Sequence, residues 1–169
     1  KLISLSFCLL EVHSYVWAYS DEQKALGIPV EENIKLANAT NPNIETIRKS
    51  IIPTQLCQVK SNVGYAPEFG IFEIGRVVEG LDNDNKCIEK KNLAITIYSK
   101  TADIKDLYIE LRDILATITD DLKHKALTFE VMEATKSYQH PVNLNKVIPD
   151  GKTIGKVGIV HPVVNKNMD

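Results

Sequence analysis

The fold is decided by the stretch FGIFEIGR at residues 69–76. It opens a longer run, residues 69–78, whose β-branched and aromatic residues predict a strand. Residues 80–91 are polar and rich in turn-forming types, which predicts a loop. Residues 93–98 predict a second strand, so the three segments together indicate a β-hairpin.

The chain before this hairpin predicts short elements joined by turns. Ser20 and the acidic residues after it have the composition of a helix start, and Gly27 has that of a helix end. Pro53 suits the first turn of another helix. The expected elements are a helix at 2–10, a strand at 11–19, a helix at 21–26, a strand at 33–36, a loop at 38–43 and a helix at 54–63.

The most regular pattern lies after the hairpin, at residues 103–118. Apolar side chains recur there at spacings of three and four, as on one face of an amphipathic helix. Asp103 and Asp106 place negative charge at the positive end of this helix. Strands are expected at residues 128–133, 142–147 and 153–160, with a Pro-Asp-Gly turn at 149–151. The order predicts a single α+β domain, residues 1–169, in which an antiparallel sheet is flanked by helices.

Composition limits the classes of function. The chain has 169 residues, is 44% hydrophobic and carries a net charge of −2, which argues against a self-sufficient nucleic-acid binder. Its longest apolar run, residues 2–10, is shorter than the roughly 20 residues that span a membrane. The three cysteines, Cys8, Cys57 and Cys87, form no C-x-x-C pair and indicate buried free thiols in a reducing, cytoplasmic compartment.

The residue types and their spacing alone indicate no active site. The four histidines lack the spacing of zinc ligands, and His140 and His161, each followed by Pro, are interpreted as structural corners. The segment GKT at residues 151–153 lacks the upstream Gly of a phosphate-binding loop, because Lys146 stands at that position. No G-x-S-x-G nucleophile motif occurs.

Four stretches, in order along the chain, resemble the core of the phenylalanyl-tRNA synthetase beta subunit. They are EVHSY at 11–15, NP at 41–42 with IRKSIIPTQL at 47–56, FEIGRV at 72–77, and IGKVGIVHP at 154–162. The His-Pro pair at 140–141 also matches, and together the matches span most of the chain. Lys49, Thr54 and the pair Val142-Asn143 depart from the family pattern.

This resemblance implies a class II aminoacyl-tRNA synthetase-like core and a fragment of a longer beta chain. In the family, the alpha subunit carries the site for phenylalanine and ATP, while the beta core is a degenerate copy that supports it in a heterotetramer. The complex attaches phenylalanine to tRNA(Phe), using ATP and Mg²⁺. The resemblance therefore implies no cofactor and no catalytic or metal-binding residue in this domain, an alpha-subunit partner, and contact with tRNA(Phe) only through the whole complex.

Arginine usage agrees with a degenerate site. Adenylate formation needs cationic groups placed against phosphates, yet the loop at 80–91 and the Gly-rich segment at 151–162 contain no Arg. Arg112 is expected on the solvated face of the helix at 103–118. Arg48, Glu73 and Arg76 are therefore the candidates for a remnant ligand site, and the alternative is that the two arginines form salt bridges holding a turn to the sheet. Two functions stay open: a non-catalytic core domain, or a stand-alone synthetase-like paralogue that binds a nucleotide or amino acid.

Overall fold

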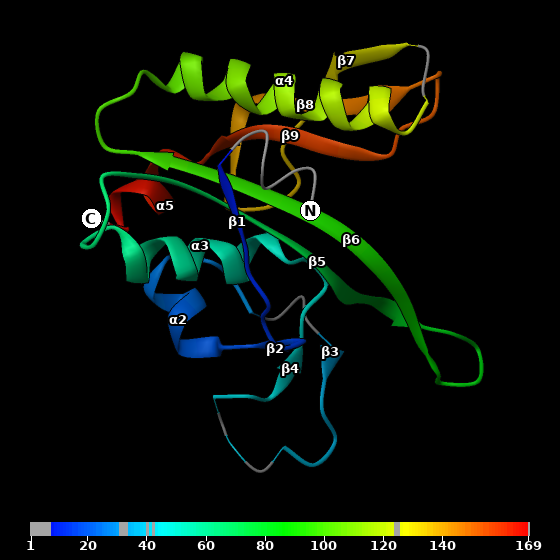
Figure 1. Cartoon of the computed structure of the whole chain (residues 1–169). Coiled ribbons are helices and arrows are strands. Elements are labelled where there is room, and N and C mark those ends of the chain that lie inside the picture. The colour runs from blue at the N-terminus through cyan, green and yellow to red at the C-terminus, as the bar shows by residue number, and fades with distance from the viewer. Residues whose placement is uncertain (1–7, 31–33, 40, 42, 124–125, 169) are drawn as a thin grey trace.

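The computed structural model describes residues 8–30, 34–39, 41, 43–123 and 126–168. Within these ranges the chain forms four helices and nine strands, and the strands form three sheets of three. Figure 1 shows the helices distributed around the long central strands. The predicted α+β class is confirmed, but one mixed and two antiparallel sheets replace the single antiparallel sheet that was predicted.

The central sheet has the strand order β1-β5-β6. It consists of β1 (Leu9–Glu11), β5 (Glu68–Leu81) and β6 (Cys87–Ser99), with β1 parallel to β5 and β6 antiparallel to it. The helix predicted at residues 2–10 is wrong for Leu9 and Leu10, and residues 1–7 lie outside the described ranges. Leu9 packs with Phe72 and Ile114, which are distant in sequence. A short apolar run is compatible with either a helix or a strand, so these long-range contacts determine that Leu9 belongs to a strand.

The hairpin of β5 and β6 is longer than predicted. Most of the loop expected at residues 80–91 is strand, and only residues 82–86 form the turn, where the Asp82 carboxylate accepts from the N–H groups of Asp84 and Lys86. The distal part of β6 is exposed on both faces, so it carries no apolar alternation that would have marked it as a strand. In Figure 1 this end of the hairpin projects beyond the helices.

One face of the hairpin is covered by α2 (Ser20–Ala25) and α3 (Ile52–Asn62). Leu26, Leu56, Val59 and Ile71 form the core between these elements. Both helices confirm the prediction, although α3 begins two residues before the expected start at 54. Gly27, with φ +75°, follows α2 in the left-handed conformation that glycine favours.

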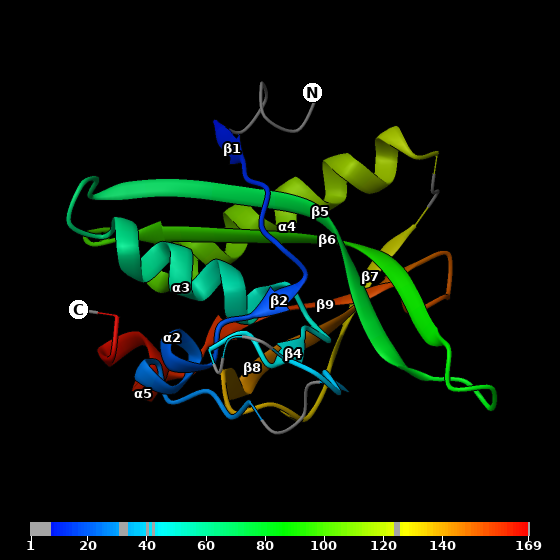
Figure 2. The ribbon, with the colours of Figure 1, turned by 90° about the horizontal axis from the view of Figure 1, so that it is seen from below.

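The opposite face is covered by α4 (Ile104–Asp121), and Figure 2 shows α3 in front of the hairpin strands and α4 behind them. Ile114 packs on Phe72, and Asp103 caps the helix by accepting from the N–H of Lys105 at 2.7 Å. The amphipathic helix is thus confirmed. Arg112 is exposed, as predicted, but its guanidinium also stacks 4.3 Å from the centroid of the Phe129 ring.

Two further sheets complete the fold. The first joins the two-residue strands β2 (Trp17–Ala18), β4 (Thr46–Ile47) and β3 (Ile34–Lys35), so the strand expected at 11–19 exists only at Glu11 and Trp17–Ala18. The second contains β7 (Leu127–Val131), β8 (Gln139–Pro149) and β9 (Gly155–Val160), near the three predicted strands. The predicted turn at 149–151 is confirmed.

The two His-Pro pairs lie at strand termini as structural corners: His140-Pro141 at the start of β8 and His161-Pro162 directly after β9. The His140 ring nitrogen Nδ1 accepts from the N–H groups of Val142 and Asn143. His161 accepts from the N–H of Val163 and thereby caps α5 (Pro162–Lys166), a short helix that was not predicted. Both histidines therefore stabilise backbone turns.

Candidate functional site

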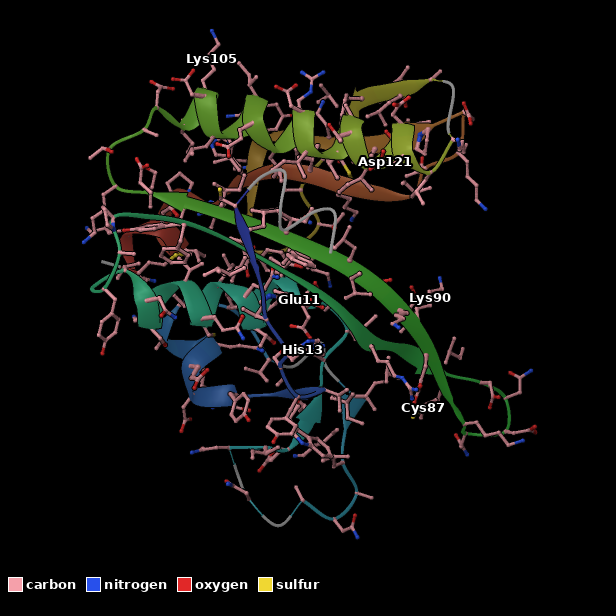
Figure 3. All side chains as sticks on the ribbon, in the orientation of Figure 1. Glu11, His13, Cys87, Lys90, Lys105 and Asp121 are labelled. Atoms are coloured by element: carbon pink, nitrogen blue, oxygen red, sulfur yellow. The ribbon has the colours of Figure 1, made fainter. Side chains whose placement is uncertain are left out.

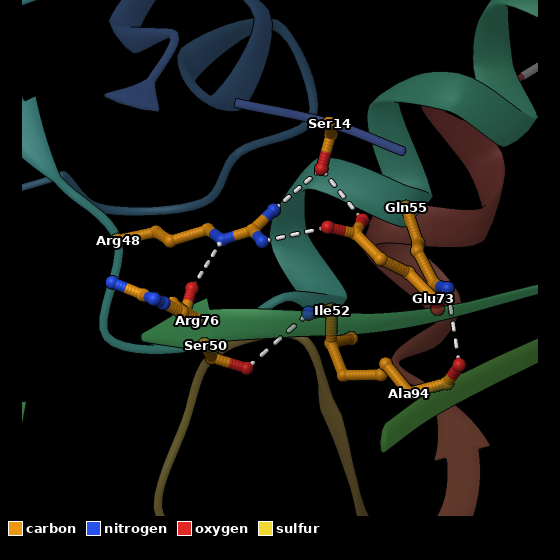
Figure 4. Close-up of polar contacts among 8 residues, drawn as sticks. All are labelled: Ser14, Arg48, Ser50, Ile52, Gln55, Glu73, Arg76 and Ala94. Carbon is orange, nitrogen blue, oxygen red and sulfur yellow. Dashed lines mark hydrogen bonds and ion pairs between the residues drawn. The ribbon is translucent and has the colours of Figure 1, made fainter. Parts of the chain in front are cut away.

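Arg48 lies at the centre of a buried polar network. It follows β4 directly, and only 1% of the residue is exposed. Its Nη2 donates to Glu73 Oε1 at 2.7 Å, its Nη1 donates to Ser14 Oγ, and its Nε donates to the Arg76 carbonyl at 3.1 Å. Figure 4 shows the guanidinium directed at these three partners, which come from two separate segments of the chain.

The network closes on itself through Ser14. Its Oγ donates to Glu73 Oε2 at 2.6 Å, so both oxygens of the Glu73 carboxylate accept hydrogen bonds from within the chain. The side chains of Arg48 and Glu73 are each 2% exposed. A buried ion pair is tolerated only when its charges are well paired and hydrogen-bonded, and this arrangement meets that requirement.

Gly75 makes room for the ion pair. A Cβ atom added at this position would lie 2.5 Å from Arg48 Nη2 and 2.5 Å from Glu73 Oε1. That separation is shorter than any real Cβ contact, so a larger residue would push the pair apart. The buried ion pair with Arg48 thus explains both Glu73, which forms it, and Gly75, which leaves room for it.

Arg76 joins the network only through its backbone carbonyl. Successive side chains of a strand point to opposite faces, so the Arg76 side chain leaves β5 on the face opposite Glu73 and Gly75. There it is 71% exposed and lies 3.3 Å from Glu89 on β6. The structure therefore brings Arg48 and Glu73 together and directs the charged group of Arg76 elsewhere.

A second buried contact fastens α3 to the other strand of the hairpin. Gln55 is fully buried; its Nε2 donates to the Ala94 carbonyl at 3.2 Å, and its Oε1 accepts from Thr96 Oγ1 at 2.7 Å. The segment at 47–56 is thus held to β5 by Arg48 and to β6 by Gln55 (Figure 4). Sequence reasoning missed both Ser14 and Gln55 as members of the site, because their partners are 59 and about 40 residues away.

Other charged side chains pair at the surface. Lys90 lies 2.8 Å from Glu79 on the hairpin, and His13 lies 3.6 Å from Glu11 near β1 (Figure 3). In the part of the chain that the structure describes, no group of three or more His, Cys, Asp or Glu side chains could hold a metal ion. No helix in that part combines the length and the apolar character needed to cross a membrane.

A cavity of about 600 Å³ has none of Ser14, Arg48, Glu73 and Arg76 among its lining residues. Its walls are α3, α4, β6, β9 and the residues around α5, and most of the side chains that line it are apolar. Lys100 and Lys166 are its charged lining residues, and it has no lining arginine. This cavity was not predicted, because no local pattern in the sequence reports a space between five elements that are separate along the chain.

Comparisons with known proteins agree with one another. A family model, described as phenylalanyl tRNA synthetase beta chain CLM domain, matches residues 3–169. The chain is 25% identical over 167 residues to the phenylalanine–tRNA ligase beta subunit of Pyrococcus horikoshii. This alignment covers 98% of this chain and 29% of that protein. It is 26% identical over 185 residues to the beta subunit from Helicobacter hepaticus, covering 98% of this chain and 22% of that one. The chain thus spans less than a third of the length of these relatives.

Proposed function

Since the chain belongs to the family of the phenylalanyl tRNA synthetase beta chain CLM domain, we propose that it is a non-catalytic core domain of a phenylalanine–tRNA ligase beta subunit. It has a class II synthetase-like core and is a single domain of a longer beta chain. Its role is to support the alpha subunit, which binds phenylalanine and ATP. The assembled cytoplasmic heterotetramer attaches phenylalanine to tRNA(Phe) with ATP and Mg²⁺.

The observation that carries this proposal is the use of Arg48. An arginine that stabilises a phosphate must present its guanidinium to the ligand, with donors aimed at the developing charge. The Arg48 guanidinium is instead enclosed with Glu73 and Ser14, and its positive charge is already compensated. The segments that resemble the family therefore build the core in this chain and leave no buried cation free for ATP.

The other two arginines support the same proposal. Arg76 is exposed on the hairpin beside Glu89, and Arg112 stacks on the Phe129 ring. All three arginines of the chain are described by the structure, and none lines the 600 Å³ cavity. Adenylate chemistry on this domain would have no arginine in place to hold the phosphates.

The proposal is tested by calorimetric titration of the full-length beta chain that carries this sequence with ATP–Mg²⁺ and with phenylalanine. We expect no saturable heat for either ligand, whereas the complex with the alpha subunit, as the positive control, binds both. The reconstituted complex should attach phenylalanine to tRNA(Phe). Saturable binding of ATP to the beta chain alone would contradict a non-catalytic core.

The cavity is the one observation that favours the alternative, a paralogue with a small-molecule site. Its volume is within the range of ligand pockets. A remnant site at Arg48, Glu73 and Arg76 would give binding of a nucleotide or amino acid that Arg76→Ala abolishes. Binding that survives Arg76→Ala and is lost on filling the cavity with Leu111→Trp would instead place the ligand there.

A further inference from the structure

We draw no further inference here: the strongest candidate, the apolar groove of about 270 Å³ between β1, α3 and β5 with exposed Leu10 and Tyr65 on its walls, carries nothing, because nothing in the structure shows what covers it.

Discussion

Arg48 and Glu73 face each other at 2.7 Å, 25 residues apart in sequence, and each side chain is 2% exposed. Their contact fixes the end of β4 against the middle of β5, and Ser14 binds both partners. The ion pair therefore joins three segments that resemble the synthetase family in sequence. Its energetic role can be measured independently of any activity.

Glu73→Gln should lower the free energy of unfolding by about 3–5 kcal/mol, because it leaves the buried Arg48 charge without its counter-charge. Urea denaturation followed by circular dichroism measures the change. Glu89→Gln is the matched control: it removes the partner of the exposed Arg76 and should cost less than about 1 kcal/mol. Equal losses for the two variants would show that the buried pair has no special role.

The double variant Arg48→Met with Glu73→Leu should recover most of that loss. It removes both charges together and leaves no uncompensated ion in the core. The same urea titration measures it, with Arg48→Met alone as the comparison. A double variant less stable than either single variant would indicate that the network stabilises the fold beyond the pairing of its charges.

Gly75→Ala should destabilise the fold by about 1–3 kcal/mol, because its methyl group would overlap Arg48 Nη2 and Glu73 Oε1. Gly80→Ala is the control on the same strand, since a Cβ there has no other atom within 4 Å. Thermal unfolding of both variants should show a lower midpoint for Gly75→Ala only. An unchanged midpoint would mean that the ion pair shifts without cost.

The Cys57 thiol should react slowly and make the stability depend on pH. Burial, and to a smaller extent the charge of Glu22, raises the pKa of Cys57 from 9.0 to about 12. Between these two values the unfolded chain loses this proton and the folded chain keeps it, so stability falls as the pH rises from 9 toward 12. The decline should be shallower in Cys57→Ala, as measured by urea denaturation at a series of pH values.

The two exposed thiols provide the control for accessibility. The prediction of buried thiols is correct for Cys57 and wrong for Cys8 and Cys87, which are exposed. A thiol reagent at pH 8 should therefore label Cys8 and Cys87 first and should label Cys57 only on unfolding. Rapid labelling of three thiols in the folded protein would contradict the burial of Cys57.

Local patterns predicted the elements whose structure is decided locally. The helix with apolar side chains at spacings of three and four appears as α4, and Asp103 caps it. The strands of the hairpin were predicted from their apolar residues, but the exposed end of β6 was not, since only pairing with β5 makes residues 87–92 a strand. Leu9 was assigned to a helix because its partners, Phe72 and Ile114, are distant in sequence.

The candidate site could be predicted only in part. The resemblance selected Arg48, Glu73 and Arg76, and the structure pairs the first two while it exposes the side chain of the third. Strand alternation could have separated Glu73 from Arg76, because residues three positions apart on a strand point to opposite faces. The contributions of Ser14 and Gln55 depend on tertiary contacts that no spacing in the sequence reports.

The proposed role of this core is to support the alpha subunit without binding phenylalanine or ATP itself. Hydrogen exchange of the full-length beta chain, alone and in complex with alpha, tests it most directly. We expect slower exchange on alpha binding at surface amides within residues 8–168, and no change in this region on adding ATP and phenylalanine to beta alone. A complex that forms without any change in this region, or a change caused by the two ligands without alpha, would contradict it.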